Sequence, residues 1–309
     1  MAEERKARIG FIGIGAMGWP MATNLVRANY PVSVFDADRG QQDRFVGKEG
    51  GRATASLAEL GRGAEVVITM LPTGAIVRQV LLETEGGLAK SLARGSVVID
   101  MSSSDPTGTR ELAAALRAHG IALVDAPVSG AVKGAVEGRL TIMIGGDDKA
   151  VIDRVRPILS VLGPRHFLTG GAGSGHAMKA LNNFLSGTGF IMMAEALIIG
   201  RKFGLDPGTM IDVINESTGR THATANLGRQ EVISRNFGTK FLLGLMAKDV
   251  KIAADLAEDL QVQAPLCRMS RDLWQRAREV VGGSEDHSAA IKYWEMLNGL
   301  SVSEGPPGE

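Results

Sequence analysis

The sequence predicts an α/β protein in which a doubly wound parallel sheet is followed by a long connecting helix and an all-helical second half. In the first half, short apolar runs alternate with helical stretches, as strands and helices do in such sheets. The run between Gly173 and Gly204 has the composition of one continuous helix, which at about 1.5 Å per residue would span about 45 Å. After Gly204 the patterns are helical, without a convincing alternating strand.

The composition is that of a soluble globular protein with room for two domains. The 309 residues are 44% hydrophobic and 22% charged, and the formal net charge is +0, which gives no support for binding to nucleic acid or to an anionic membrane. The long helix carries Asn182, Asn183 and Glu195, which argues against a membrane span. The N-terminus lacks secretory or transit character, and Cys267 is the one cysteine, so we expect a cytoplasmic protein.

The first apolar run, at residues 8–13, is typical of a buried parallel strand, and it continues into a G-x-G-x-x-G motif. In such a motif the first glycine permits a tight turn, the second lets a pyrophosphate approach the backbone, and the third lets the following helix pack on the strand. The motif therefore predicts a dinucleotide-binding loop formed by Gly13, Gly15, Ala16, Met17 and Gly18.

A second strand, Val32–Phe35, ends in Asp36, 23 residues after Gly13. A carboxylate at this position can accept hydrogen bonds from ribose hydroxyls and would repel a 2′-phosphate, which favours NAD over NADP. Two observations leave alternatives open. Arg39 lies three residues further on and could hold such a phosphate, and Asp36 could instead cap its own turn.

Four further strands are expected in the first half, at residues 66–71, 96–101, 121–128 and 140–146. Ligands on open α/β sheets bind beyond the carboxyl ends of the strands. We therefore expect one rim, beside the glycine loop, to carry Leu71, Pro72, Ser103, Ser129 and Gly130. Ser129 and Gly130 could form a plain turn, or their N–H groups could bind a carboxylate. No G-x-S-x-G elbow is present, so serine hydrolase chemistry has little support.

The long helix carries Lys179, Asn182 and Asn183 at positions i, i+3 and i+4, which project from one face. These side chains could lie on a solvated face, or they could form a site, because burying them without partners is costly. His176 precedes Lys179 by three residues, and we interpret it as a helix-start residue rather than a catalyst. No H-x-x-H or H-E-x-x-H spacing occurs, so no metal site is predicted.

Five motifs, in the order GFIGIGAMGWPMATNL, DAPVSGAVKGAVEGRLTIMIGG, GSGHAMKALNN, AKDVKIA and EDHSA, resemble those of the β-hydroxyacid dehydrogenases. This family includes 3-hydroxyisobutyrate dehydrogenase and tartronate semialdehyde reductase. The resemblance extends from Arg8 to about Leu300. It implies a Rossmann-type domain over residues 1–170, a connecting helix over 171–203, a helical substrate and oligomerisation domain over 204–301, and a disordered tail over 302–309.

The resemblance also implies an activity and site residues. The activity is NAD-dependent hydride transfer to or from a short 3-hydroxy acid such as 3-hydroxyisobutyrate, by a homodimer or homotetramer. The family pattern makes Lys179 the general acid/base, assigns substrate binding to Ser129, Gly130 and Asn183, and places Lys248 by the cofactor.

The chain departs from the family pattern before Lys248, where Leu242, Leu243 and Gly244 make the predicted substrate wall more apolar. Lys133, in SGAVKGA, is a second departure, because it adds a positive charge. Four alternatives to the 3-hydroxyisobutyrate-like activity remain: a tartronate semialdehyde reductase, an imine reductase, a decarboxylating phosphosugar dehydrogenase and a catalytically silent NAD sensor. The lysine at 179 counts against an imine reductase, and the phosphosugar enzymes have a longer helical domain. The complete set of predicted site residues counts against the sensor.

Overall fold

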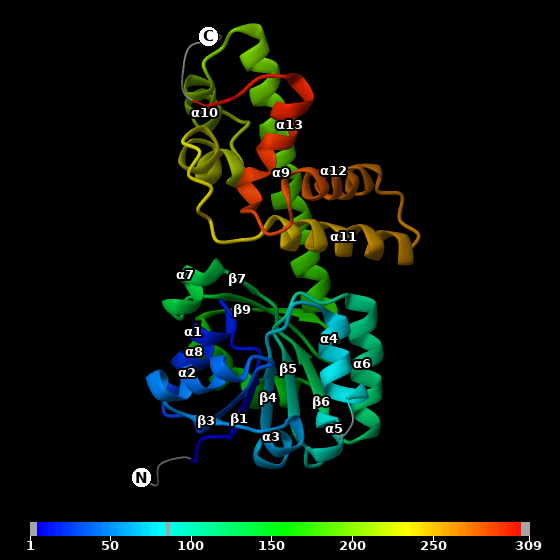
Figure 1. Ribbon diagram of the computed structural model, residues 1–309. Helices are drawn as coiled ribbons and strands as arrows, with labels where there is room; N and C mark the ends of the chain where they lie inside the picture. Colours follow the sequence, from blue (N-terminus) through cyan, green and yellow to red (C-terminus); the bar gives the residue numbers. More distant parts are fainter. Residues whose placement is uncertain (1–4, 85–86, 304–309) are drawn as a thin grey trace. The chain divides into compact units, whose positions relative to one another are not determined.

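The computed structural model describes residues 5–84 and 87–303, which form two compact units divided between Lys179 and Ala180 (Figure 1). Most of the predicted tail, residues 304–309, lies outside the described residues. Val302 was predicted to belong to that tail. It is instead buried and donates its backbone N–H to Glu295 Oε1 at 2.9 Å, so ordered packing continues beyond the predicted boundary at residue 301.

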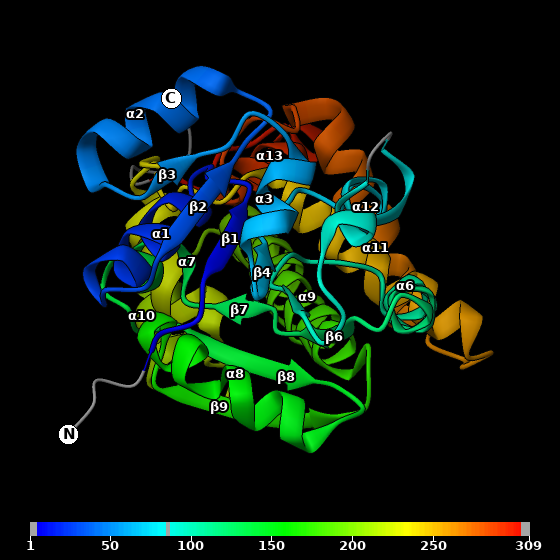
Figure 2. The same ribbon diagram turned by 90° about the horizontal axis from the view of Figure 1, so that it is seen from below.

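One nine-stranded sheet lies at the centre of the N-terminal unit, with the strand order β3-β2-β1-β4-β5-β6-β8-β7 and with β9 paired to β8. Figure 2 shows β2 and β3 at one end of the sheet and β8 and β9 at the other. The strands are β1 (Ile9–Ile12), β2 (Val32–Phe35), β3 (Arg52–Ala53), β4 (Val66–Thr69), β5 (Val97–Asp100), β6 (Ala122–Asp125), β7 (Val128–Ser129), β8 (Thr141–Gly145) and β9 (Arg165–Gly170).

The prediction of a parallel sheet is confirmed from β3 through β6 and for the pair of β8 with β9, and it is wrong for the pairs of β8 with β6 and β7. Both of those pairs are antiparallel. Only the six-residue helix α7 (Ala131–Val136) lies between β7 and β8, and this connection is too short to cross a face of the sheet as a parallel connection must. The sequence did not predict β9, because its Phe167 and Leu168 are both exposed and the strand lacks a buried periodic face.

Helices cover both faces of the sheet, as the doubly wound prediction requires. On one face α1 (Gly18–Arg27), α2 (Arg39–Glu49) and α8 (Lys149–Leu162) bury Met21, Phe45 and Leu159 against the strands. The other face is covered by α3 (Leu57–Gly63), α4 (Gly74–Arg78), the π-helical turn η1 (Gln79–Glu83), α5 (Leu88–Ser91) and α6 (Pro106–Ala118) (Figure 1).

The helix α9 (Ser174–Phe203) is continuous over 30 residues, as predicted, and belongs to both units. It is the one helix in the described chain that is long and apolar enough to cross a membrane. However, 61% of its most apolar window is buried within the structure, as in the core helix of a soluble protein.

The C-terminal unit is helical in its described part. Asp206 caps α10 by accepting the Thr209 N–H, and Pro207 is the first residue of that helix, as the sequence predicts. A core around Trp274 and Phe190 joins the helices. They are α10 (Pro207–Asn215), the π-helix η2 (Thr224–Ile233), α11 (Leu243–Asp259), α12 (Pro265–Val281), the 3₁₀-helix η3 (His287–Ala290) and α13 (Ile291–Asn298).

Candidate active site

The glycine loop joins β1 to α1, and its three glycines have different surroundings. Gly13 adopts a φ of 90°, and a Cβ there would collide with the Met70 carbonyl. A Cβ on Gly18 would collide with the Gly13 carbonyl. Neither of these two positions therefore has room for a side chain. A Cβ on Gly15 would meet nothing within 4 Å. The loop therefore leaves open space at the glycine that a pyrophosphate would approach.

The start of α1 differs from the starts of its neighbours. Its N-cap residue Met17 forms no side-chain cap, and its first turn contains no acidic residue. Five other helices of this unit carry side-chain caps, from Asp38, Ser56, Thr73, Asp105 and Asp148. Uncapped N–H groups at the positive end of a helix suit a bound phosphate, and Ala16 and Met17 lie at this end. The loop fits a dinucleotide.

Asp36 follows β2 and turns toward the glycine loop. Its carboxylate accepts the Ile14 N–H at 2.9 Å and the Asp38 N–H at 3.0 Å. The alternative that Asp36 caps its own turn is therefore confirmed. The role in ribose binding stays open, because each carboxylate oxygen has a second lone pair. Arg39 is exposed at the first position of α2.

The loops after β4 and β5 lie together at the same edge of the sheet. The Leu71 N–H donates to Ser102 Oγ at 2.9 Å, which joins the two loops directly. The buried Asp100 carboxylate accepts the Ser102 N–H at 3.0 Å and the Ser104 hydroxyl at 2.8 Å. Pro72 and Ser103 follow these bonded residues, so the structure brings them to the rim predicted for the cofactor. Their contact with a cofactor stays a prediction.

Ser129 ends β7, and the next two residues have left-handed backbone conformations. Gly130 has a φ of 138° and Ala131 a φ of 53°. A positive φ is uncommon for a residue with a Cβ and is found where the surrounding structure imposes it, often at binding sites. The Gly134 N–H then donates to the Gly130 carbonyl at the start of α7, which also carries the exposed Lys133.

Two glycines allow α9 to begin directly on the backbone of the sheet. A Cβ on Gly175 would lie 2.9 Å from the carbonyl oxygen of Asp125, and a Cβ on Gly145 would lie 2.8 Å from the backbone nitrogen of Gly175. The Asp125 carboxylate accepts the N–H groups of Gly173 at 2.8 Å and His176 at 3.0 Å. The first turn of α9 is therefore attached to the carboxyl end of β6, and Lys179 follows within the next turn.

Asn183 lies one turn after Lys179 in α9 and belongs to the C-terminal unit. It is buried, and its side-chain amide donates to Asp249 Oδ2 at 2.6 Å. The Lys248 ammonium lies 2.9 Å from Asp249 Oδ1, and Asn182 donates to Asn183 Oδ1 at 3.1 Å. The interpretation as a solvated face is therefore wrong for Asn183.

Comparisons with known proteins cover nearly the whole chain. Residues 8–171 match the family model for the NAD binding domain of 6-phosphogluconate dehydrogenase. Residues 173–294 match the model described as NAD-binding of NADP-dependent 3-hydroxyisobutyrate dehydrogenase. The 2-(hydroxymethyl)glutarate dehydrogenase of Eubacterium barkeri is 37% identical over 302 residues, which are 98% of this chain and 99% of that protein. The 3-hydroxyisobutyrate dehydrogenase of Pseudomonas aeruginosa is 37% identical over 274 residues, which are 86% and 90% of the two chains.

A solved structure agrees with these matches. The Mycobacterium tuberculosis 3-hydroxyisobutyrate dehydrogenase, with L-serine, superposes with a TM-score of 0.85 at 32% identity over 94% of this chain and 99% of that one. The chain belongs to the β-hydroxyacid dehydrogenase family. As a member of this family it is a dinucleotide-binding oxidoreductase that acts on CH–OH groups of hydroxy acids.

Three buried aspartates of this family member were not predicted as part of the site. Asp249 is part of the AKDVKIA motif, yet no local pattern indicated that its carboxylate would hold Asn183. Asp100 and Asp125 each end a buried strand, and a carboxylate at that position was the available signal. His176 lies in the first turn of α9, as expected of a helix-start residue, and its ring is buried.

Residues 242–244, where the chain departs from the family pattern before Lys248, affect the site less than the sequence suggests. Leu243 is fully buried in the core of the C-terminal unit, and the Gly244 N–H donates to the Gly283 carbonyl at 3.0 Å. Leu242 alone of the three has a largely exposed side chain. The expectation that Leu243 belongs to a substrate wall is therefore wrong.

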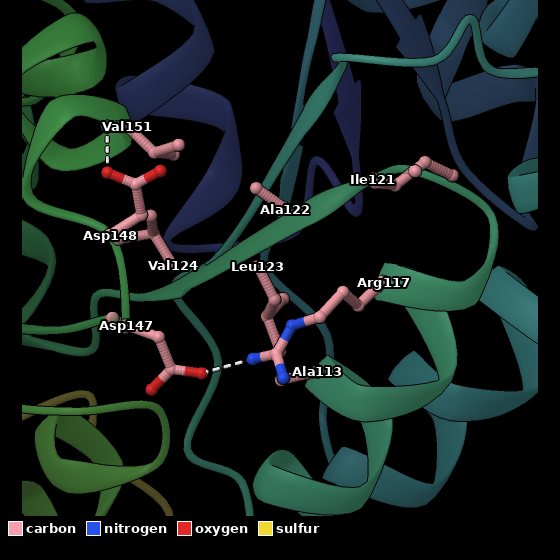
Figure 3. Close-up of a pocket in the computed structure, with 11 residues that line it drawn as sticks. Ala113, Arg117, Ile121, Ala122, Leu123, Val124, Asp147, Asp148 and Val151 are labelled. Carbon is pink, nitrogen blue, oxygen red and sulfur yellow. Dashed lines mark hydrogen bonds and ion pairs between the residues drawn. The ribbon is translucent and has the colours of Figure 1, made fainter.

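A shallow pocket of about 320 Å³ lies elsewhere on the N-terminal unit, between the end of α6, β6 and the start of α8 (Figure 3). Arg117 forms an ion pair with Asp147 across it, and Asp148 caps α8 by accepting the N–H of Val151. None of its lining residues belongs to the predicted site. Within residues 5–84 and 87–303 no three His, Cys, Asp or Glu side chains come close enough together to hold a metal ion.

Proposed function

We propose that this protein is an NAD-dependent oxidoreductase that transfers a hydride between the nicotinamide and a short 3-hydroxy acid resembling 3-hydroxyisobutyrate. The attachment of α9 to the sheet carries this proposal. Asp125 ends β6 and holds the start of α9, and Lys179 lies five residues after Ser174, about 8 Å along the helix. The glycine loop follows β1, which runs parallel to β4, β5 and β6, so the lysine and the loop belong to the same edge of the sheet.

Lys179 is the proposed general acid/base. When bound, the nicotinamide would supply or accept the hydride, which is chemistry the protein itself lacks. In oxidation, the neutral amine of Lys179 takes the proton of the substrate hydroxyl. In reduction, the ammonium gives that proton to the carbonyl oxygen. A free lysine titrates near pH 10.4, so we expect oxidation to be faster at alkaline pH.

The remaining residues bind and orient the substrate in this proposal. Ser129 and Gly130 offer backbone N–H groups to a carboxylate, beside the left-handed backbone at Ala131. Asn183 has its amide orientation set by the bonds to Asp249 and Asn182, which leaves one N–H of that amide for the substrate. Lys248 contributes a positive charge beside Asp249.

NAD rather than NADP is the proposed cofactor. The Asp36 carboxylate lies 2.9 Å from the Ile14 backbone nitrogen, beside the loop that would hold the pyrophosphate, where the adenosine ribose would follow. A 2′-phosphate at this place would meet a negative charge. Arg39 is a basic side chain that could offset that repulsion, and it is exposed at the start of α2.

The experiment is a measurement of initial rates with a panel of C3–C4 hydroxy acids and semialdehydes, with NAD and NADP in parallel. We expect turnover of a 3-hydroxyisobutyrate-like acid and a higher kcat/KM with NAD. Lys179→Ala should reduce kcat by at least about 100-fold, the lower range of general acid/base contributions, while NADH still binds, as measured by its fluorescence. Lys202→Ala is the matched control, because Lys202 is an exposed lysine in the last turn of the same helix.

Each alternative gives a different result in the same assay. Preferred turnover of glycerate or tartronate semialdehyde would assign the reductase activity instead. Binding of NADH without turnover of any panel member would favour the sensor. If Lys179→Ala kept most of the wild-type activity, Lys179 would have no place in the mechanism.

We also infer a homodimer or homotetramer in a reducing compartment such as the cytoplasm. Cys267, the one cysteine, is buried, and burial raises the pKa of its thiol, which suits an inert reduced side chain. Exposed apolar side chains along α9 support the oligomer.

A further inference from the structure

Four polar side chains form a buried cluster where α9 meets the sheet: Asp100, Thr109, Asp125 and His176, which we call the α9 cluster. Each is at most 3% exposed. His176 Nδ1 lies 2.8 Å from Thr109 Oγ1, and its Nε2 lies 3.7 Å from Asp100 Oδ2. His176 Nδ1 is 4.0 Å from Asp125 Oδ2. The imidazole ring therefore lies between two carboxylates that end neighbouring parallel strands.

The α9 cluster connects the parts of the predicted site that lie in the N-terminal unit. Through Asp100 it contacts the loop after β5, where Ser102 holds the Leu71 N–H of the cofactor rim. Through Asp125 it holds the first turn of α9. Asp125 is also followed, after Ala126 and Pro127, by the strand that ends at Ser129.

The ring of His176 is buried among polar groups, and in the described part of the chain only one of its two nitrogens has a hydrogen-bond partner. Its Nε2 is buried and has no hydrogen-bond partner within the described residues, and burial of an unpaired polar atom is unfavourable. The backbone N–H of His176 already attaches the helix to Asp125, so the side chain is not needed for that attachment. The bond of the ring to Thr109 is therefore a second attachment, separate from that of the main chain.

We propose that His176 is a positioning residue for Lys179, an inference that rests on the function proposed above. The two residues are three apart in α9 and share a face of the helix. Asp125 holds the main chain of the first turn, close to the helix axis. The bond to Thr109 on α6 holds a point away from that axis, on the face that carries Lys179. Together the two attachments fix the rotation of α9 about its own axis and therefore the direction in which the lysine leaves the helix.

The test compares His176→Leu, which removes both ring nitrogens, with His176→Asn, whose amide can occupy the place of Nδ1 and retain the bond to Thr109. Thr109→Val removes the partner and leaves the ring. Thr54→Val is the matched control, since Thr54 is a buried threonine of the same unit whose hydroxyl donates to the Val34 carbonyl. Melting temperatures of all four variants establish that they fold.

With the hydroxy acid that the wild type turns over best, His176→Leu and Thr109→Val should lower kcat by about 10- to 100-fold, the range expected when a catalytic group is misplaced by about 1 Å. KM and the Kd for NADH should change by less than about threefold. His176→Asn should recover most of the lost kcat. A purely structural role would instead lower the melting temperature and leave kcat of the folded fraction as in Thr54→Val.

A second measurement does not depend on turnover. Reductive methylation with ¹³C-formaldehyde labels the lysines of the protein without cofactor, and the Lys179 resonance is assigned from its absence in Lys179→Arg. We expect this resonance to move in His176→Leu and Thr109→Val and to stay in place in Thr54→Val. If no panel substrate is turned over, the proposed function fails, and the resonance alone still tests the positioning role. A Lys179 resonance and kcat that change no more in His176→Leu than in Thr54→Val would overturn the inference.

Discussion

His287 is buried in the C-terminal unit beside Asp286, and the pKa values of both side chains are lowered, for different reasons. Burial lowers the pKa of His287, although the neighbouring Asp286 charge acts in the opposite direction. Burial would raise the pKa of Asp286, but hydrogen bonds from Ser288 and Thr239 outweigh it and lower that pKa. Thr239 Oγ1 donates to Asp286 at 2.7 Å and lies 2.9 Å from His287 Nδ1, so the neutral ring donates from Nδ1 to Thr239.

The free energy of unfolding should therefore decrease as the pH is lowered below about 6.5, the ordinary pKa of histidine. The native state holds His287 neutral and the unfolded state protonates it first, so acid favours unfolding. The slope from this one proton is at most about 1.4 kcal/mol per pH unit. Urea unfolding between pH 5 and pH 7.5 measures it, and His287→Gln should have the shallower slope. Equal slopes in the two proteins would mean that His287 does not set the acid sensitivity.

At the residue scale, the sequence predicted the positions that local chemistry decides. Gly13 and Gly18 were identified from turn geometry and close packing, and the structure shows the collisions that a Cβ would cause there. Asp36 was identified from its place after β2. Asp249 was not, because its relation to Asn183 exists only after helices 66 residues apart in the chain have packed together.

At the element scale, the contact of α9 with the sheet depends on glycine. Gly175 lies where α9 approaches the backbone of β6, whereas Gly47 is exposed within α2, and a Cβ there would meet nothing within 4 Å. Both are helical, so the same substitution has opposite effects. We expect Gly175→Ala to destabilise the protein by about 1–3 kcal/mol, the usual cost of overpacking. Gly47→Ala should stabilise it by about 0.5–1 kcal/mol through helix propensity.

Chemical denaturation of both variants measures this difference. Because the start of α9 also directs Lys179, Gly175→Ala should lose activity beyond its loss of stability, and Gly47→Ala should keep wild-type kcat. Equal stabilities of the two variants would show that α9 can move away from β6 without cost.

The elements themselves were predicted to different degrees. Buried parallel strands and amphipathic helices have a periodicity that can be read from the chain, and β1, β2, β4 and β5 fall where expected. The direction of β8 was not predicted, because a short apolar run has the same residue pattern in a parallel and in an antiparallel strand pair. The π-helix Thr224–Ile233 also has no recognised sequence signal.

At the scale of the whole molecule, α9 presents an apolar stripe to solvent in the C-terminal unit. Leu185, Met192 and Ile199 recur every seven residues and are 68%, 52% and 69% exposed. A spacing of seven places them in one row, as at the interface of paired helices. A second copy of the chain can bury this row against its own equivalent in a symmetric dimer.

Ile199→Glu should therefore dissociate the oligomer, because it places a charge within the row. Val213→Glu is the matched control: it makes a similar change at an exposed apolar residue on α10, outside the row. Light scattering coupled to size exclusion, over a dilution series, gives the mass of each. A wild-type monomer at micromolar concentration, or an unchanged mass for Ile199→Glu, would remove this interface.

The sequence by itself determined the parallel part of the sheet that contains β1, β2, β4 and β5, the glycine loop, the carboxylate after β2 and the helix that carries Lys179. These features follow from local periodicity and turn chemistry, which act between residues close in the chain. Only the tertiary structure decided that Asp125 and His176, 51 residues apart, hold the start of α9, and that Asp249 holds Asn183. Those carboxylates acquire their partners through packing, and the burial that makes each contact decisive does not exist until the chain has folded.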